Sequence, residues 1–259
     1  MSVRTWHVPP LGIMMFDAYK MLWYGHYYTL YCQMVECVFD KQIARVDSLR
    51  YIQPLTWGHN ASKPVIECHQ ISSDKCICTL FSDENKETLL NTATFFFSDL
   101  AMTRPIRQNV PTTTRDVATL ESFRVYSDML TKDGHLHARH VFDWFEQVRT
   151  NVFGGQPTLR KLFEIQGQSI VVAKVENLQF HNVALSPNGL NRVVVVTAVC
   201  TLNRTLLKSM FQMTQQICLN DGTVLCQADV TLCCKDNTTN KVSRLSDDML
   251  QSLHCPVVS

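Results

Sequence analysis

The sequence predicts an α+β protein made of two tandem units, each with one long helix and an antiparallel sheet. Three observations lead to this prediction. At 259 residues the chain is long for one domain and suits two. The same order of elements, a strand, a long helix and a run of strands, occurs twice along it. The turn sequence Asn220-Asp221-Gly222 between two alternating apolar runs is a strong hairpin signal, which favours antiparallel strands.

The first half contains an acid, Asp17, followed by a helical pattern of apolar residues. These recur at spacings of three and four with few charges between them, so most of this helix should be buried. They are Tyr27, Leu30, Tyr31, Met34, Val35 and Val38. Three strands are expected after the helix, at 64–70, 76–81 and 88–97.

The second half repeats this order of elements. A strand is expected at 122–128, a turn at Gly134-His135, and an amphipathic helix at 138–152 that stops at Gly154-Gly155. The apolar face of that helix is Val141, Phe142, Phe145, Val148 and Val152. The strands expected after it are 169–175, 192–202, 209–219 and 223–234.

The two halves can be aligned by residue number. An offset of 114 places Tyr31 on Phe145, and an offset of 135 places Thr88 on Thr223. The second half therefore carries about 21 extra residues between its helix and its last strand. The predicted organisation is a unit at 1–105, a linker at 106–121 and a unit at 122–259.

Composition narrows the class of protein. A formal net charge of +1 argues against a nucleic-acid binder that works by neutralising phosphates. With 46% hydrophobic residues the chain should fold, and no apolar run approaches the roughly 20 residues of a membrane span. No secretory leader opens the sequence, so we expect a cytoplasmic protein, with the mitochondrial or plastid matrix as the alternative.

The eleven cysteines are expected to be buried, reduced thiols rather than metal ligands. No CxxC pair is present, and Cys76 and Cys78 form a CxC on one predicted strand. The spacing of His135, His137 and His140 matches no known ligand pattern. We therefore expect no metal site and no cofactor.

Two segments resemble the sequence motifs of one enzyme superfamily. Residues 17–27, D-A-Y-K-M-L-W-Y-G-H-Y, resemble the D-x-x-G-x-V-x-Y-x-x-Y motif of 4-hydroxybenzoyl-CoA-type thioesterases. Residues 133–137, D-G-H-L-H, with 144–150, W-F-E-Q-V-R-T, are similar to the G-H-V-N-N and W-F-E-x-x-R-T stretches of the same superfamily. That superfamily includes the acyl-ACP thioesterases, which fuse two hotdog units in one chain.

The resemblance implies two tandem hotdog units, each an antiparallel sheet wrapped around a long central helix. It implies that Asp17 is the catalytic acid, at the interface of the two units. Further catalytic candidates are Asp133, His135 and Glu146, and the substrate-binding candidates are Trp23, Tyr24, Gly25, His26 and Tyr27. Two departures stand out. Lys20 replaces the motif glycine, and Thr131 occupies the place of the acid in the second unit, so Asp17 is the expected working acid.

The implied function is hydrolysis of an acyl-CoA or acyl-ACP thioester. A hotdog dehydratase is one alternative, for which His135 with Asp17 is the available pair of catalytic groups. A non-catalytic structural or acyl-carrier-binding subunit is another. The expected partner is an acyl thioester, with no nucleic acid, and a homodimer of double-hotdog chains is compatible with the resemblance. His26 and His140 are expected to be core or rim histidines rather than proton carriers, and Glu146 and Arg149 can form a surface ion pair.

Overall fold

The computed structural model describes residues 3–9, 11, 24–56, 63–98, 118–181, 183–185, 194–206, 208–247 and 250. The chain divides into two compact units: Met1–Thr103 with Lys174–Phe180, and Arg104–Ala173 with His181–Ser259. The predicted linker lies outside the described residues up to 117, and residues 118–121 already belong to a strand of the second unit. The boundaries at 105 and 122 stay predictions.

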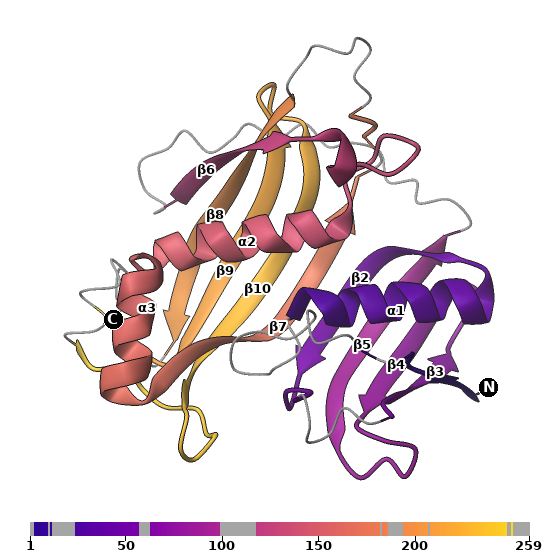
Figure 1. The fold of residues 1–259 in the computed structure, drawn as a ribbon, viewed down its shortest axis with the longest axis horizontal. Coiled ribbons are helices and arrows are strands. Elements are labelled where there is room, and N and C mark those ends of the chain that lie inside the picture. The colour runs from indigo at the N-terminus through magenta and orange to yellow at the C-terminus, as the bar shows by residue number, and fades with distance from the viewer. Residues whose placement is uncertain are drawn as a thin grey trace. The chain divides into compact units, whose positions relative to one another are not determined.

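The first unit is an antiparallel sheet with one long helix. Its elements are β1 (Val3–His7), α1 (Tyr24–Phe39), β2 (Gln42–Tyr51), β3 (Val65–Gln70), β4 (Lys75–Phe81) and β5 (Leu89–Ser98). The strands lie in the order β1-β3-β4-β5-β2, and each neighbouring pair is antiparallel. Residues Lys174–Phe180 extend this sheet beside β2. Figure 1 shows α1 lying across one face of the sheet.

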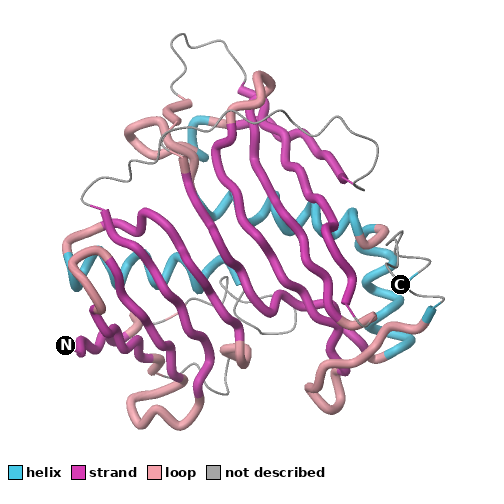
Figure 2. The backbone as a smooth tube through the Cα atoms, turned by 180° about the vertical axis from the view of Figure 1, so that it is seen from behind, coloured by secondary structure: helices cyan, strands magenta, loops and turns pink. Residues whose placement is uncertain are grey.

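The second unit has the same plan with one more helix. Its elements are β6 (Ala118–Val125), α2 (Ala138–Val152), α3 (Gly155–Gln166), the part of β7 (Gln168–Phe180) up to Ala173, β8 (Val194–Leu206), β9 (Met210–Leu219) and β10 (Val224–Asp236). The strand order is β6-β8-β9-β10-β7. Figure 2 shows the opposite face of this sheet, with α2 behind the strands. The predicted hairpin turn joins β9 to β10, with Gly222 at a φ of 81° that suits glycine.

The predicted internal repeat is confirmed by the topology. If the strands of each unit are numbered from one to five along the chain, both units have the same strand order, 1-3-4-5-2. The two long helices begin at Tyr24 and Ala138, 114 residues apart, and the last strands begin at Leu89 and Val224, 135 residues apart. The 12-residue helix α3 supplies much of the extra length in the second unit.

The structure differs from the sequence prediction at four places. No strand was expected at Val3–His7, where β1 lies. Gly154 and Gly155, at φ of 79° and 81°, do end α2, but α3 begins at once instead of a strand or loop. The predicted strand at 122–128 is β6, which ends at Val125 and is followed by a 3₁₀ turn. The strand β2 was missed because its pairing with β5 shifts register twice, which breaks the two-residue alternation that marks a strand.

Each core forms between the long helix and the sheet of its own unit. In α1 the buried face includes Tyr27, Leu30, Tyr31, Met34 and Val35, and in α2 it includes Val141, Phe142, Phe145, Val148 and Val152. These are the apolar faces that the spacing predicted, except that Val38 is only half-buried. Seven of the ten described cysteines are buried, as the apolar runs around them predicted. Among the described residues, the structure contains no helix of the length and apolarity that a membrane crossing needs.

Tyr31 and Asn91 form a polar pair at the centre of the first core. Both residues have no exposed surface, and the Tyr31 hydroxyl donates a hydrogen bond of 2.8 Å to Asn91 Oδ1. Burial raises the pKa of Tyr31 well above its usual value, so the phenol stays neutral and keeps the proton it donates. This bond connects α1 to β5.

Replacing Tyr31 with phenylalanine should destabilise the protein by about 1–3 kcal/mol, because Asn91 Oδ1 would be left buried without its donor. Urea unfolding followed by circular dichroism measures the change. The matched control is Tyr126→Phe, since Tyr126 is 55% exposed and should change stability by less than about 0.5 kcal/mol. Equal effects of the two variants would contradict the assigned role.

Candidate functional site

The first-unit candidates that the structure describes, Tyr24 to Tyr27, lie in the first turn of α1. Asp17 and Trp23 are outside the described residues, and Tyr24 is the first described residue of the helix. Gly25 is buried and His26 is half-buried. Within the described residues of α1, the first turn holds no acidic side chain that would offset the positive end of the helix dipole. An oxygen that gains negative charge would be stabilised at such a helix end.

Tyr27 is held within the first core. It is 2% exposed, its hydroxyl accepts a hydrogen bond of 2.9 Å from the backbone N–H of Leu55, and its ring meets that of Tyr51 edge-on at 5.2 Å. The hydroxyl thereby satisfies a buried backbone donor, which gives Tyr27 a structural role alongside its predicted role in binding substrate.

The second-unit candidates Asp133 and His135 share the tight turn before α2. Thr131 N–H donates to the carbonyl of His135 at 2.7 Å, Gly134 N–H donates to the carbonyl of Thr131 at 2.9 Å, and Gly134 has a φ of 80°. The Thr131 hydroxyl accepts the His135 N–H at 3.1 Å. The residue in the place of the family acid therefore holds the turn together. Asp133 is exposed and His135 is half-buried.

The start of α2 carries no capping side chain. His137 occupies the N-cap position with extended backbone angles and makes no capping hydrogen bond. Serine, threonine, aspartate or asparagine would normally accept a backbone N–H there. The first turn of α2 also contains no acidic residue. The turn that holds Asp133 and His135 therefore precedes a helix N-terminus whose partial positive charge is not offset by a side chain of that first turn.

Glu146 lies on α2, within the helix and away from the turn in sequence. It is half-buried, and its negative charge acts on the neighbouring carboxyl of Asp143. Burial, and then the charge of Glu146, raise the pKa of Asp143 above its ordinary value. The structure thus groups Asp133 with His135 on one turn and Glu146 with Asp143 on the helix.

His26 and His140 occupy the same position in the two units. Each is the third residue of its helix, 114 residues apart, and each is half-buried. Burial lowers the pKa of both imidazoles, and the positive charge of Arg139 lowers that of His140 further. The His140 ring accepts a hydrogen bond of 3.1 Å from Arg139 Nε and lies 6.3 Å from the ring of Trp144. Burial thus favours the neutral form of both imidazoles.

Arg149 is the site residue whose environment the sequence did not indicate. It is only 7% exposed, so its side chain is buried rather than on the helix surface. Its Nη1 donates a hydrogen bond of 3.1 Å to Gln215 Oε1 on β9. Gln215 Nε2 in turn donates a hydrogen bond of 2.7 Å to the carbonyl of Phe145. Helical spacing could have indicated this, because Arg149 follows the buried Phe145 by four residues and so lies on the same side of α2.

Comparison with known proteins gives similarity at the level of structure. No protein-family model matches the sequence, and no curated protein matches it. A structure described as an oleoyl thioesterase from Lactobacillus plantarum has a TM-score of 0.58 at 9% identity, covering 90% of this chain and 96% of the other. The 12:0-ACP thioesterase from Umbellularia californica has a TM-score of 0.55 at 11% identity, covering 90% and 94%.

A third similar structure is the dehydratase domain of PpsC from Mycobacterium tuberculosis, in complex with C12:1-CoA. Its TM-score is 0.52 at 12% identity, covering 90% of this chain and 94% of the other. The fold is a double hotdog. The strand order, the repeated long helix and coverage of nine-tenths of the chain agree on this, and the fold predicted from the sequence motifs is confirmed.

Replacing Gln215 with alanine should cost about 2–4 kcal/mol of stability, because Arg149 and the Phe145 carbonyl would each lose a buried partner. Chemical denaturation measures this loss. Gln212→Ala on the same strand is the control, since Gln212 is exposed and should have almost no effect. A Gln215→Ala protein as stable as the control would show that this pair is dispensable.

Stability should fall as the pH drops from 7.5 to 5.5, in part through His26 and His140. Their pKa values are lowered from the ordinary 6.5, so below that value the unfolded chain binds more protons than the folded one. The His26→Gln/His140→Gln protein should therefore lose less stability between these pH values than the unmodified protein. The control is His7→Gln, because the His7 side chain is 67% exposed. Identical pH profiles for all three proteins would refute this.

Proposed function

We propose that this protein hydrolyses the thioester of an acyl-CoA or an acyl-ACP. The observation that carries the proposal is the double-hotdog fold, which the chain shares over nine-tenths of its length with an oleoyl thioesterase and a 12:0-ACP thioesterase. The D-x-x-x-x-x-x-Y-x-x-Y spacing at 17–27 and the W-F-E-Q-V-R-T stretch support the same activity. The free thiols of the described cysteines suit a reducing compartment, and we propose the cytoplasm.

In the proposed reaction Asp17 is the general base. Its carboxylate takes a proton from a water molecule, the resulting hydroxide adds to the thioester carbonyl, and the C–S bond breaks to release the acid and the thiol, which receives the proton. The N–H groups at the start of α1, near Tyr24 and Gly25, stabilise the oxyanion that forms in between. Gly25 has no side chain, so the carbonyl can approach the helix backbone.

The remaining candidates hold the substrate or support the second unit. Trp23, Tyr24 and His26 are proposed to contact the acyl thioester, and the neutral imidazole of His26 can accept a hydrogen bond from it. Asp133, His135 and Glu146 are proposed as secondary groups, because Thr131 is engaged in holding its own turn where the family would have an acid. This supports Asp17 as the principal acid.

A second candidate function is dehydration or hydration of an acyl thioester. The similarity to a dehydratase domain, found with an acyl-CoA bound, favours it. That reaction needs a histidine and an acid on opposite sides of the substrate, and the chain offers His135 and Asp17. The half-buried His135 on a rigid turn is consistent with such a role.

The Asp17→Asn protein should lose about 10²–10⁴-fold in turnover of its preferred acyl-CoA, the usual contribution of one acid–base group. Release of free thiol from acyl-CoAs of several chain lengths measures the rate. Asp40→Asn is the matched control: Asp40 is exposed, follows the other end of α1, and has a positive φ that asparagine tolerates. Its rate should be unchanged.

Three results would separate the candidate functions. Thiol release that depends on Asp17 supports hydrolysis. Addition of water to enoyl thioesters without thiol release would replace hydrolysis with the dehydratase assignment. Binding of acyl carrier protein with neither reaction would leave a non-catalytic subunit and contradict the proposal.

A further inference from the structure

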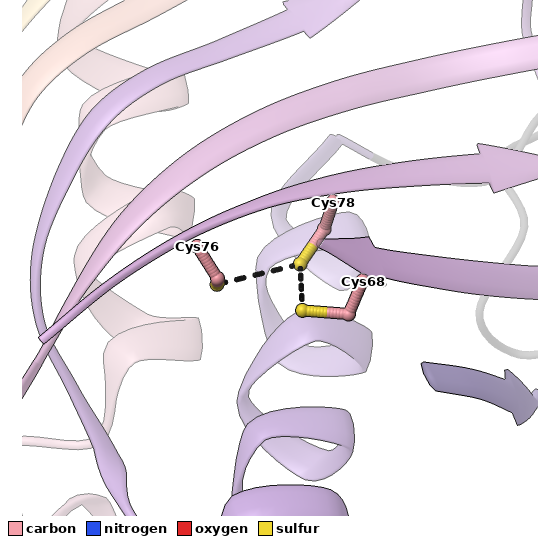
Figure 3. A group of neighbouring side chains, drawn as sticks. All are labelled: Cys68, Cys76 and Cys78. Carbon is pink, nitrogen blue, oxygen red and sulfur yellow. Dashed lines mark hydrogen bonds between the residues drawn. The ribbon is translucent and has the colours of Figure 1, made fainter. Parts of the chain in front are cut away.

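Three cysteine side chains converge inside the first unit. Cys78 Sγ donates a hydrogen bond of 3.1 Å to Cys68 Sγ and lies 3.6 Å from Cys76 Sγ. All three sulfur atoms lie within 4.8 Å of one another. Each residue is at most 1% exposed. Figure 3 shows the three sulfur atoms turned toward one another from two neighbouring strands. We refer to them as the thiol cluster.

Strand pairing brings the thiol cluster together. Cys68 on β3 lies directly opposite Cys78 on β4, and Cys76 precedes Cys78 by two residues, which puts both on the same face of β4. That face is the buried one, whereas Ile77 between them is exposed. The sequence showed only the CxC pair, because the third thiol comes from an adjacent strand eight residues earlier.

The hotdog core does not require thiols at these positions. Strand pairing in the second unit sets Leu202 opposite Met213, as Cys68 stands opposite Cys78. Phe211 precedes Met213 by two residues and corresponds to Cys76. All three second-unit residues are buried apolar side chains. The same place in the same fold is thus filled by ordinary hydrophobic packing in one unit and by three sulfurs in the other.

We propose that the thiol cluster binds one thiophilic metal ion, copper(I) or zinc(II), through three thiolates. Thiolates are soft ligands that select these ions. Bonds of about 2.3 Å to one ion hold three sulfurs roughly 3.8–4.0 Å apart, so the cluster needs only a slight opening. Zinc prefers four ligands, and the cluster supplies three from the described residues, which favours copper(I).

Binding is an exchange of protons for the metal. Three S–H bonds lose their protons to solvent and three metal–sulfur bonds form, with no change in the oxidation state of the ion supplied. A Cys68–Cys78 disulfide is the competing use of the cluster. A disulfide would involve only Cys68 and Cys78 and would not explain why Cys76 Sγ lies beside them, whereas a metal ion would bind all three sulfurs.

The full-length protein, reduced and handled without oxygen, should be titrated separately with copper(I) and with zinc(II) against a competing chelator. We expect about one ion retained per chain after desalting, together with a sulfur-to-metal absorption band for copper(I). Retention of either ion supports the site, and comparison of the two affinities identifies the ion. X-ray absorption of the loaded wild-type protein should show sulfur neighbours at about 2.3 Å without need of any variant.

Cys76→Ala and Cys78→Ala should each lower the affinity for the metal by at least roughly 10–100-fold. That is the usual cost of losing a residue that only supports a ligand, and these residues are ligands themselves. Cys226→Ala, at an equally buried position of β10, is the control and should bind as the wild type does. Binding unaffected by the cluster variants, no retained ion, or a Cys68–Cys78 disulfide in the protein as purified would overturn the proposal. Metal retention does not depend on thioester hydrolysis, so failure of either proposal can be recognised separately.

Discussion

Packing of one face of a long helix onto one face of an antiparallel sheet is the interaction on which each unit depends. An isolated helix of 15 or 16 residues is marginal in water, and an isolated sheet leaves one apolar face exposed. Burying Tyr31 and Met34 in one unit, and Phe142 and Phe145 in the other, removes both problems at once. The described candidates that lie on these helices, Tyr24 to Tyr27 on α1 and Glu146 on α2, are positioned by this contact.

The two units share this packing of helix on sheet, but the polar and sulfur-containing side chains in their cores differ. The first encloses a Tyr31–Asn91 hydrogen bond and the thiol cluster, and the second encloses Arg149 with Gln215. A buried polar group must find a partner, so each of these residues constrains the strand or helix opposite to it. The two units share a topology while their interiors carry different chemistry.

Sequence reasoning reached the helices, most strands and the repeat, because apolar spacing records which face of an element is buried. It gave no strand at β1. It also missed β2, where two register shifts break the alternation, and α3, where a pair of glycines suggested a stop. The resemblance of two motifs led to the hotdog fold. For the candidate site it named Asp133 and His135 on one turn, but it could not show that Thr131 holds that turn or that Arg149 is buried.

By itself, the sequence determined the class of fold and the offset between its two halves, and it named the candidate residues for the proposed site. These are properties of local spacing and of motifs contiguous in the chain. Only the tertiary structure decided which distant side chains meet, such as Cys68 with Cys78 and Arg149 with Gln215. The physical reason is that strand register and helix docking set such contacts, and both depend on the packing of the whole unit.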